Sequence, residues 1–386
     1  MILHIVSRNK NFTTSYICFH ERNFGDRENY FFAVSCGLDS VSPVPDLPNV
    51  YTAVNFMALL DMELFKRLSE QSEKMIVSGI WEDSREFLLG LPQSIADKTY
   101  LQFWGGDFYG YRKIPFYEFM EMKRNEGKRG FFNLLRYVKY SVRNTMDKAK
   151  LAKCIKRCRC CIVLIEGDTM KLRELFPQAR QVLVAPMGGG TTEAAMLREG
   201  YRKAALRELN AKSEKKIHRI IVGNSATREN HHLEAFEMLK GLDLNGVEII
   251  CPLSYGNMNY AKIIREKGQK LFGEAFHPLD EMMEYEKYIE LLAGCDVGIF
   301  NNDRQQAMGN ITTLLAMGRK VYMRPDTSMW ERYRKAGYRI FDINELKGTD
   351  IEELFYFEPV WVYQNEKAYM ATFDDNVRKW EVVLNS

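Results

Sequence analysis

Strand-length apolar runs alternate with helical stretches along this chain, and the alternation occurs twice. In the first half, the apolar runs occupy residues 1–6, 30–36, 74–81, 99–105, 160–167 and 181–187. A second series occupies residues 217–226, 246–257, 296–302, 320–325 and 338–343, with helical spacing between the runs. Such alternation is typical of parallel strands joined by crossover helices. Because 386 residues exceed one ordinary core, we expect two Rossmann-like, doubly wound α/β domains facing a central cleft.

A polar stretch at residues 187–216 separates the two series. We expect an N-terminal domain over residues 1–205, a C-terminal domain over residues 206–365, and a final helix over residues 366–386 that packs back across the junction. No basic segment followed by a long apolar stretch opens the chain, and the longest apolar runs are strand-sized. They fall far short of the roughly 20 residues of a membrane span. These features predict a cytoplasmic protein.

Positive charge is concentrated in residues 112–159. Fifteen Lys/Arg stand there against four acids, although the whole chain carries only +3. Helical spacing places four apolar residues on one face, with basic residues beside them: Phe131, Leu134, Leu135 and Val138, flanked by Arg136, Lys139 and Arg143. The face can pack on the core with its basic side in solvent, or it can adsorb to anionic lipid headgroups. A single basic patch is weak support for nucleic acid, which we do not expect as a partner.

Ligands of doubly wound sheets bind in the turns that follow the carboxyl ends of the strands. The turn "VGNSATREN" at residues 222–230 offers Gly223 for close backbone approach, and Arg228 near free N–H groups suits a phosphate. In "PLSYGNMNY", Tyr255 can stack on a ligand or hydrogen-bond to it. In "DRQQAMGNITT", Arg304 and two amides precede a predicted helix start at Gly309-Asn310. The alternative for each turn is simple capping of the following helix.

One turn, "FWGGDFYG" at residues 103–110, offers a carboxylate among aromatic residues and glycines. This combination suits a carbohydrate, and Asp107 is a candidate general base. The alternative is that Asp107 stabilises the turn through its own backbone.

Several signatures of other sites are absent from the sequence. The chain has no D-x-D, no G-x-x-x-x-G-K-[ST], no G-x-S-x-G and no zinc-type histidine pair. We therefore expect no metal and no cofactor. A bound diphosphate would then be held by helix N-termini and basic side chains.

The turns resemble, as an ordered set, those of glycosyltransferase family 56, the 4-alpha-L-fucosyltransferase family. The set consists of "WGGD", "VGNSATREN-H", "P-SYG", "Y-KYIELLAGCDVGIF", "RQQAMGNITTLLAMGRKV" and a late Trp380. The resemblance implies a GT-B fold and metal-independent hexosyl transfer from a TDP-sugar of the N-acetylfucosamine type. It also implies an undecaprenyl-diphosphate-linked acceptor at the inner face of the cytoplasmic membrane, as in enterobacterial common antigen synthesis.

The resemblance also assigns roles to individual residues. Donor-binding residues would be Gly223, Asn224, Ser225, Arg228, Tyr255, Gly256, Arg304, Gln305, Gln306, Gly309 and Asn310. The acceptor side would include Trp104, Gly105, Gly106 and Asp107, the residue that we expect on chemical grounds to be the base. Residues 7–12 and 187–196 depart from the family pattern on that side. The rival expectations are a capsular or O-antigen transferase with a different nucleotide-sugar and a non-catalytic, membrane-associated subunit of the same fold.

Overall fold

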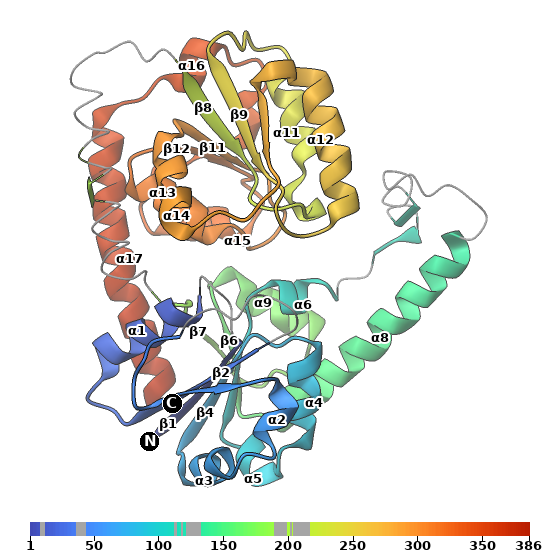
Figure 1. Ribbon diagram of the computed structural model, residues 1–386, viewed down its shortest axis with the longest axis vertical. Helices are drawn as coiled ribbons and strands as arrows, with labels where there is room; N and C mark the ends of the chain where they lie inside the picture. The colour runs from blue at the N-terminus through green and yellow to red at the C-terminus, as the bar shows by residue number, and fades with distance from the viewer. Residues whose placement is uncertain are drawn as a thin grey trace. The chain divides into compact units, whose positions relative to one another are not determined.

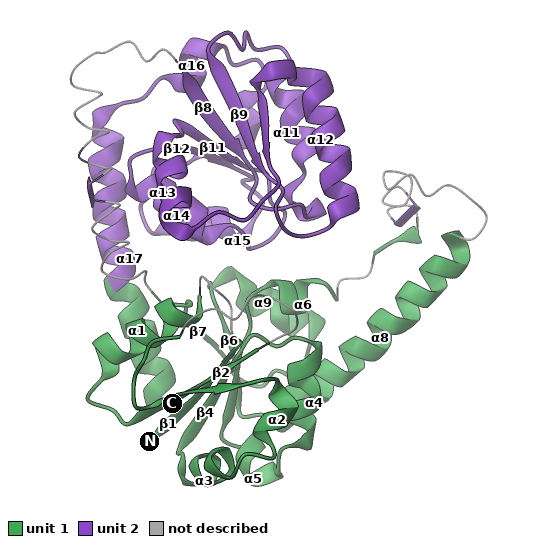
Figure 2. Cartoon of the chain, viewed as in Figure 1, with its two compact units in different colours: residues 1–116, 131–191, 374–386 green, residues 117–130, 192–373 purple. Residues whose placement is uncertain are grey.

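The computed structural model describes residues 1–7, 12–35, 44–111, 114–116, 119–120, 133–188, 199–200, 203 and 217–386 (Figure 1). Most of the predicted linker at residues 187–216 and part of the basic segment, including Phe131, lie outside these residues. The chain forms two compact units (Figure 2). Unit 1 consists of residues 1–116, 131–191 and 374–386, and unit 2 of residues 117–130 and 192–373.

Unit 1 is built on a parallel sheet. Its strands are β1 (Ile2–Ser7), β2 (Asn29–Val34), β3 (Val50–Ala53), β4 (Lys74–Ser78), β5 (Thr99–Gln102), β6 (Cys160–Val163) and β7 (Val182–Val184). In the described part of the chain they form seven strands in the order β3-β2-β1-β4-β5-β6-β7. The central strands read as continuous apolar runs because helices bury both faces of a parallel sheet. The helices are α1 (Thr13–Phe24), α2 (Phe56–Leu59), α3 (Glu63–Gln71), α4 (Glu82–Gly90), α5 (Gln93–Ala96), α6 (Gly106–Tyr109), α8 (Asn133–Arg157) and α9 (Gly167–Leu175).

Unit 2 repeats this architecture. Its strands are β8 (His218–Val222), β9 (Val247–Pro252), β10 (Phe276–Leu279), β11 (Val297–Phe300), β12 (Lys320–Met323) and β13 (Phe341–Asp342). They form a six-stranded parallel sheet in the order β10-β9-β8-β11-β12-β13. The principal helices are α11 (His232–Leu239), α12 (Met258–Phe272), α13 (Tyr285–Gly294), α14 (Met308–Ala316), α15 (Ser328–Lys335) and α16 (Ile351–Phe355), and a 3₁₀ turn η1 (Arg228–Asn230) precedes α11.

Helix α17 (Pro359–Asn385) begins in unit 2 and ends in unit 1. Its Trp380 is fully buried in unit 1, where the indole Nε1 donates to the Pro186 carbonyl at 2.8 Å. The ring lies 4.3 Å from the His20 ring, centroid to centroid. Lys74 donates to the Val383 carbonyl, and Arg27 donates to the Asn385 side chain at 2.7 Å. Cations near the last carbonyls of a helix favour its macrodipole.

The two parallel-sheet α/β domains predicted from the sequence are confirmed. Two edge strands, β3 and β10, were not predicted, because both are short and partly exposed and β10 contains Pro278. Two helices rather than one lie between β3 and β4: α2 ends at Leu59 and α3 begins at Glu63.

Candidate functional site

The three predicted turns of unit 2 lie at one edge of its sheet. Strands β9, β8 and β11 are neighbours and parallel, so their carboxyl ends, and the turns that follow them, are adjacent. This is the edge where doubly wound sheets bind ligands.

The turn after β8 is organised by Asn230. The amide oxygen of Asn230 accepts from the Asn224 backbone N–H at 3.0 Å, and its Nδ2 donates to the Ser225 carbonyl at 3.1 Å. Gly223 has φ +69°, and a Cβ there would lie 2.6 Å from His232 Nε2 and 2.9 Å from the Asn230 oxygen. Only glycine fits this position without displacing the residues that shape the turn.

The turn after β9 is joined to the first one. Asn224 Nδ2 donates to the Tyr255 hydroxyl at 2.9 Å, and the Ala226 backbone N–H donates to the Tyr255 carbonyl at 2.8 Å. Gly256 has φ +109°, and a Cβ there would lie 2.7 Å from the Ala226 carbonyl oxygen. The Tyr255 side chain is 47% exposed, so one face of the ring is accessible to a ligand.

The turn after β11 also meets the first turn. Gln306 Nε2 donates to the Ser225 and Thr227 hydroxyls at 3.1 and 2.9 Å. The Asn302 Nδ2 donates to the Asn230 amide oxygen at 3.1 Å. The structure therefore brings the predicted residues of the first and third turns into one hydrogen-bonded network, in which Gln306 is a direct link.

Basic side chains and a helix N-terminus lie within the same turns. Arg304 donates to the Gln305 carbonyl at 3.0 Å, and its Nε lies 3.7 Å from a Glu229 carboxylate oxygen. The Arg228 guanidinium lies over the Tyr260 ring, 5.2 Å from the centroid.

Helix α14 begins at Met308, and no side chain caps its first turn. It therefore starts one residue before the predicted Gly309-Asn310. A Cβ on Gly309 would meet only open space. The Asn310 Nδ2 donates to the Tyr288 hydroxyl at 2.7 Å and is therefore directed toward α13. Exposed N–H groups at such a helix start favour an anion.

Four amide oxygens at this edge are buried without a hydrogen-bond donor among the residues that the structure describes. They are Asn224 Oδ1, Asn302 Oδ1, Gln305 Oε1 and Gln306 Oε1. A buried acceptor without a partner is costly, so such groups are normally paired with water or a ligand. Hydroxyl or N–H groups of a ligand would satisfy them. The sequence prediction missed Asn230, which ends the 3₁₀ turn before α11, and Asn302, which lies two residues after β11.

In unit 1, Asp107 lies at the carboxyl edge of the sheet and is 2% exposed. Its Oδ1 accepts from the Trp104 backbone N–H at 2.9 Å, and its Oδ2 accepts from the Ile80 backbone N–H at 3.0 Å. Burial raises the pKa of Asp107 to about 6, although the backbone N–H groups oppose the rise. The hydrogen bonds suit a turn-stabilising carboxylate, while a pKa near neutrality suits a general base.

The remaining predicted residues of unit 1 surround Asp107. Gly105 has φ +96° and precedes α6, whose first residue is Gly106. Trp104 Nε1 donates to the Ser78 hydroxyl at 2.9 Å. Two further aromatic rings, not predicted from the sequence, gather at Trp104: Phe12 at 5.6 Å and Trp81 at 6.3 Å between ring centroids. They come from turns distant in sequence, so no local pattern connects them.

Helix α8 exposes an apolar line in its N-terminal part. Leu134, Val138, Val142 and Met146 recur at intervals of four residues and are 57%, 51%, 54% and 61% exposed. Leu135 is exposed beside them. The buried apolar residues of α8 lie near its end: Leu151, Cys154 and Ile155. The alternative that this face packs on the core is therefore wrong for Leu134, Leu135 and Val138.

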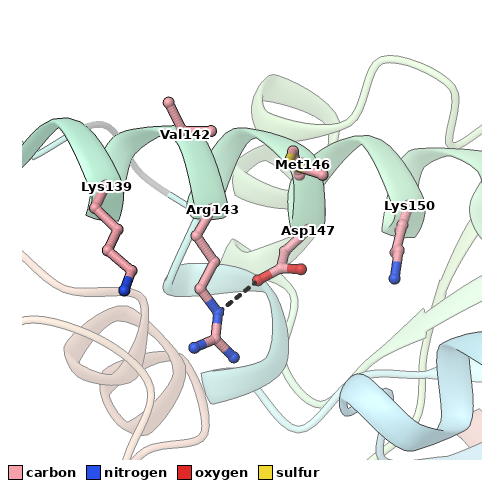
Figure 3. A pocket seen from close by; sticks show the side chains of 6 residues that line it. All are labelled: Lys139, Val142, Arg143, Met146, Asp147 and Lys150. Atoms are coloured by element: carbon pink, nitrogen blue, oxygen red, sulfur yellow. Dashed lines mark ion pairs between the residues drawn. The ribbon is translucent and has the colours of Figure 1, made fainter.

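A row of charged side chains follows the apolar line of α8. Lys139, Arg143, Asp147 and Lys150 extend from one side of the helix, and Val142 and Met146 extend from another (Figure 3). The six residues line a shallow groove of about 350 Å³. Arg143 lies 3.3 Å from Glu82 of α4 and 3.7 Å from Asp147, measured between charged atoms. The exposed part of the helix thus presents an apolar side and a mainly basic side (Figure 3).

The described residues contain neither a membrane-spanning helix nor a metal-binding cluster of side chains. No helix there is long and apolar enough to cross a membrane. Within the same residues, no group of three or more His, Cys, Asp or Glu side chains is arranged to hold a metal ion.

The fold of the chain matches that of solved glycosyltransferases. Sucrose-phosphate synthase from Thermosynechococcus elongatus aligns with a TM-score of 0.66 and 11% identity over 100% of this chain and 98% of that one. An alpha,alpha-trehalose-phosphate synthase from Burkholderia xenovorans aligns with a TM-score of 0.60 and 9% identity over 100% and 99%. An alpha-glucosyltransferase in complex with UDP aligns with a TM-score of 0.58 and 13% identity, again over 100% and 99%. These likenesses confirm the predicted GT-B fold.

The sequence of unit 2 carries a family signature in addition to this fold. The model of the family described as 4-alpha-L-fucosyltransferase glycosyl transferase group 56 matches residues 200–357, which include all three turns. The chain is a glycosyltransferase of the GT-B fold. Over residues 200–357 it matches the model of group 56, so the predicted resemblance is confirmed there.

Proposed function

We propose that the chain transfers a deoxy-amino sugar of the N-acetylfucosamine type from a TDP-sugar to an undecaprenyl-diphosphate-linked glycan. The observation that carries this proposal is the network joining the turns after β8 and β11, where Gln306 bonds to Ser225 and Thr227. The match to group 56 supports it. So does the likeness to an alpha-glucosyltransferase in complex with UDP, a nucleoside diphosphate.

The donor would bind at the edge of unit 2. Arg228, Arg304 and the uncapped N-terminus of α14 offer positive charge and N–H groups to the diphosphate. The unpaired amide oxygens of Asn224, Asn302, Gln305 and Gln306 would accept hydrogen bonds from the hydroxyl and N–H groups of the sugar or base. The exposed ring of Tyr255 would stack on an apolar face of the ligand.

Transfer would begin with attack of an acceptor hydroxyl on the anomeric carbon of the donor. The bond between that carbon and the diphosphate oxygen breaks, and TDP leaves with the electron pair. Arg228 and Arg304 would stabilise the charge on the leaving diphosphate. In the base role, Asp107 takes the proton of the acceptor hydroxyl. Its raised pKa, about 6, leaves it ionised at pH 7 while bringing it nearer to the pKa of a useful base.

We further propose that α8 holds the protein on the cytoplasmic face of a membrane that contains anionic lipid. Its exposed apolar line, from Leu134 to Met146, would enter the headgroup region. Arg136, Lys139 and Arg143 would lie against lipid phosphates beside that line. A lipid-linked acceptor is confined to this surface, so adsorption would bring enzyme and acceptor together.

The test is a transfer screen with purified protein, a panel of TDP- and UDP-sugars, and undecaprenyl-diphosphate-linked glycans as acceptors. The proposal expects TDP release with transfer of a deoxy-amino sugar of the N-acetylfucosamine type. Turnover only with another nucleotide-sugar would identify a capsular or O-antigen transferase instead. Absence of both turnover and TDP-sugar binding would favour a non-catalytic, membrane-associated subunit. A Gln306→Ala variant is the control, because it removes the link between the turns and should reduce donor use.

A further inference from the structure

Two residues of unit 2 adopt a backbone conformation that side chains rarely favour. Among the residues that the structure describes, His231 (φ 45°) and Ala307 (φ 57°) are the two non-glycine residues with positive φ. His231 is the last residue before α11, and Ala307 is the last residue before α14. Both therefore end a candidate donor-binding turn. Such strain persists only where surrounding contacts hold it, and it concentrates at functional sites.

The contacts that hold His231 extend to both turns. Its Nδ1 lies 3.1 Å from Glu234 of α11, and its Nε2 lies 3.2 Å from Asp303 in the turn after β11. Its carbonyl oxygen accepts from Asn301 Nδ2 at 3.3 Å. A protonated imidazole donates through both nitrogens, so the charged form satisfies both carboxylates at once.

Further contacts join the same two segments. The Asp303 backbone N–H donates to the Glu229 carbonyl at 3.2 Å, and Asn302 Nδ2 donates to the Asn230 amide oxygen at 3.1 Å. Arg304, next to Asp303 in sequence, lies 3.7 Å from the Glu229 carboxylate. Among these contacts, the link from His231 to Asp303 involves a histidine, whose side chain gains or loses its proton near neutral pH.

Charged groups surround His231 on each element packed against it. Glu234 lies on α11, Asp303 and Arg304 follow β11, and Arg228 and Glu229 form η1. After β12, Arg324 lies 3.6 Å from Glu234 and 3.3 Å from Asp326. The hydrogen bond to Asp303 raises the pKa of His231 above its ordinary 6.5, with support from Glu234, while burial and Arg324 oppose the rise.

We propose that His231 is a positioning residue of the donor site, whose imidazolium ties Asp303 to the start of α11 and thereby holds Arg304 beside the turn that contains Asn224. The proposal rests on the proposed function for the identity of the ligand, a nucleoside diphosphate-sugar. Loss of the proton weakens the tie to Asp303 and so loosens one of the contacts that hold the turn after β11. Donor affinity therefore falls as the pH rises through the His231 titration, and donor binding in turn favours the protonated imidazole.

The first experiment measures the affinity for TDP-glucose by calorimetry between pH 6.0 and 8.5. The diphosphate of this probe is esterified at both ends, so it does not itself titrate in this range. The variant is His231→Asn, since asparagine tolerates positive φ but is too short to reach Asp303. The matched control is His218→Asn. His218 pairs with Asp296, 3.4 Å away, at the opposite end of β8.

Wild type and His218→Asn should bind about tenfold more weakly at pH 8.5 than at pH 6.0, the change expected if binding moves the His231 pKa by one unit. His231→Asn should bind weakly and equally at both values. A wild-type pH dependence that persists in His231→Asn would overturn the proposal. A purely structural role would lower the melting temperature of the variant without removing the pH dependence.

The second experiment does not depend on the donor. NMR titration of the His231 ring should give a pKa above 6.5 in the wild type and a lower value in Asp303→Asn, which keeps the shape of the side chain but not its charge. An unchanged value would refute the link between the two residues. If the NMR titration confirms the link but the wild type binds no TDP-glucose at any pH, the proposed donor class is wrong, while the link between His231 and Asp303 stands.

Discussion

Replacement of Asp107 by asparagine separates the two roles that its environment suits. Asp107 is the buried carboxylate at the carboxyl edge of unit 1, and each of its oxygens accepts a backbone N–H. Asparagine has nearly the same shape but only one acceptor oxygen. One backbone N–H, of Trp104 or of Ile80, must then face the amide NH₂ group. The substitution removes both the negative charge and one hydrogen bond.

Two opposing energies decide the stability of Asp107→Asn. The Trp104 N–H donates to both oxygens, at 2.9 and 3.0 Å, so the amide NH₂ group replaces one acceptor of a buried N–H, which costs about 1–3 kcal/mol. Removal of the charge acts in the other direction. The difference between a folded pKa of about 6 and the ordinary 3.8 corresponds to about 3 kcal/mol against the ionised form. At pH 7.5 the two effects largely cancel, and we expect a melting temperature close to that of the wild type.

The pH dependence of stability shows whether the Asp107 carboxyl group stabilises or destabilises the fold at a given pH. The pKa of Asp107 is raised in the folded state, so its favourable contribution is fully present below about pH 4 and is lost as the pH rises through about 6. Asparagine has no such dependence. The melting temperature of the wild type relative to Asp107→Asn should therefore increase between pH 7.5 and pH 4.5. A constant difference would show that the carboxylate does not titrate as the structure requires.

Turnover then separates the base from the turn-stabilising residue. If Asp107 is the base, Asp107→Asn should lose about 10²–10⁴-fold in kcat while it binds TDP-sugar normally. Turnover like that of the wild type would remove Asp107 from the mechanism. Asp296→Asn is the matched control, because Asp296 accepts a backbone N–H from Arg219 at 2.9 Å but lies at the amino end of β11.

Three further outcomes follow from the structure. Replacing Arg136, Lys139 and Arg143 by glutamine should weaken binding to anionic vesicles by about 3 kcal/mol, roughly two orders of magnitude in affinity, as measured by vesicle sedimentation. The same change at three exposed lysines of α12 should have little effect, and undiminished binding of the α8 variant would make its basic face structural. Burial lowers the pKa of His4 to about 3 and that of His20 well below 6.5, so both stabilise the neutral-pH fold, and this stability should decline as the pH falls below about 6.5. Neither His20 ring nitrogen has a hydrogen-bond partner among the described residues, so His20→Phe should reduce the fall in melting temperature at acidic pH. An unchanged fall would show that His20 does not contribute to it. Finally, Gln306→Ala removes two hydrogen bonds between the turns, so it should weaken TDP-glucose binding about tenfold and slightly lower the melting temperature, and equal affinity by calorimetry would place the ligand elsewhere.

Much of the fold was predictable because buried parallel strands have continuous apolar sequences. β1 and β4 are buried along their whole length, and their residues stand out from the flanking polar turns. β3 lacks that signal: Val50 and Tyr51 are partly exposed and Thr52 is exposed. An edge strand packs on one side only, so its sequence resembles that of a loop.

The positions of the candidate site residues were predictable, but their connections were not. Parallel strands bring their carboxyl ends to one edge, which is sufficient to place Asn224, Tyr255 and Gln306 near one another. The bond between Asn230 and Asn302 joins residues 72 apart and depends on which strands are neighbours. Likewise, no sequence pattern indicates that His231 reaches Asp303, because the two residues lie in different turns that are distant in the sequence.

The groups at the edge of unit 2 together select a ligand with two different ends. Arg228, Arg304 and the start of α14 favour negative charge, which inorganic phosphate alone would satisfy. The unpaired oxygens of Asn224, Asn302, Gln305 and Gln306 select against it, because inorganic phosphate at neutral pH has too few O–H groups to satisfy all four acceptors. A ligand that carries a diphosphate at one end and hydroxyl or N–H groups at the other satisfies both sets. A nucleotide-sugar has this structure, whereas the nucleoside diphosphate left after transfer has lost the hydroxyl groups of the sugar, so the same site would release its product more readily than its substrate.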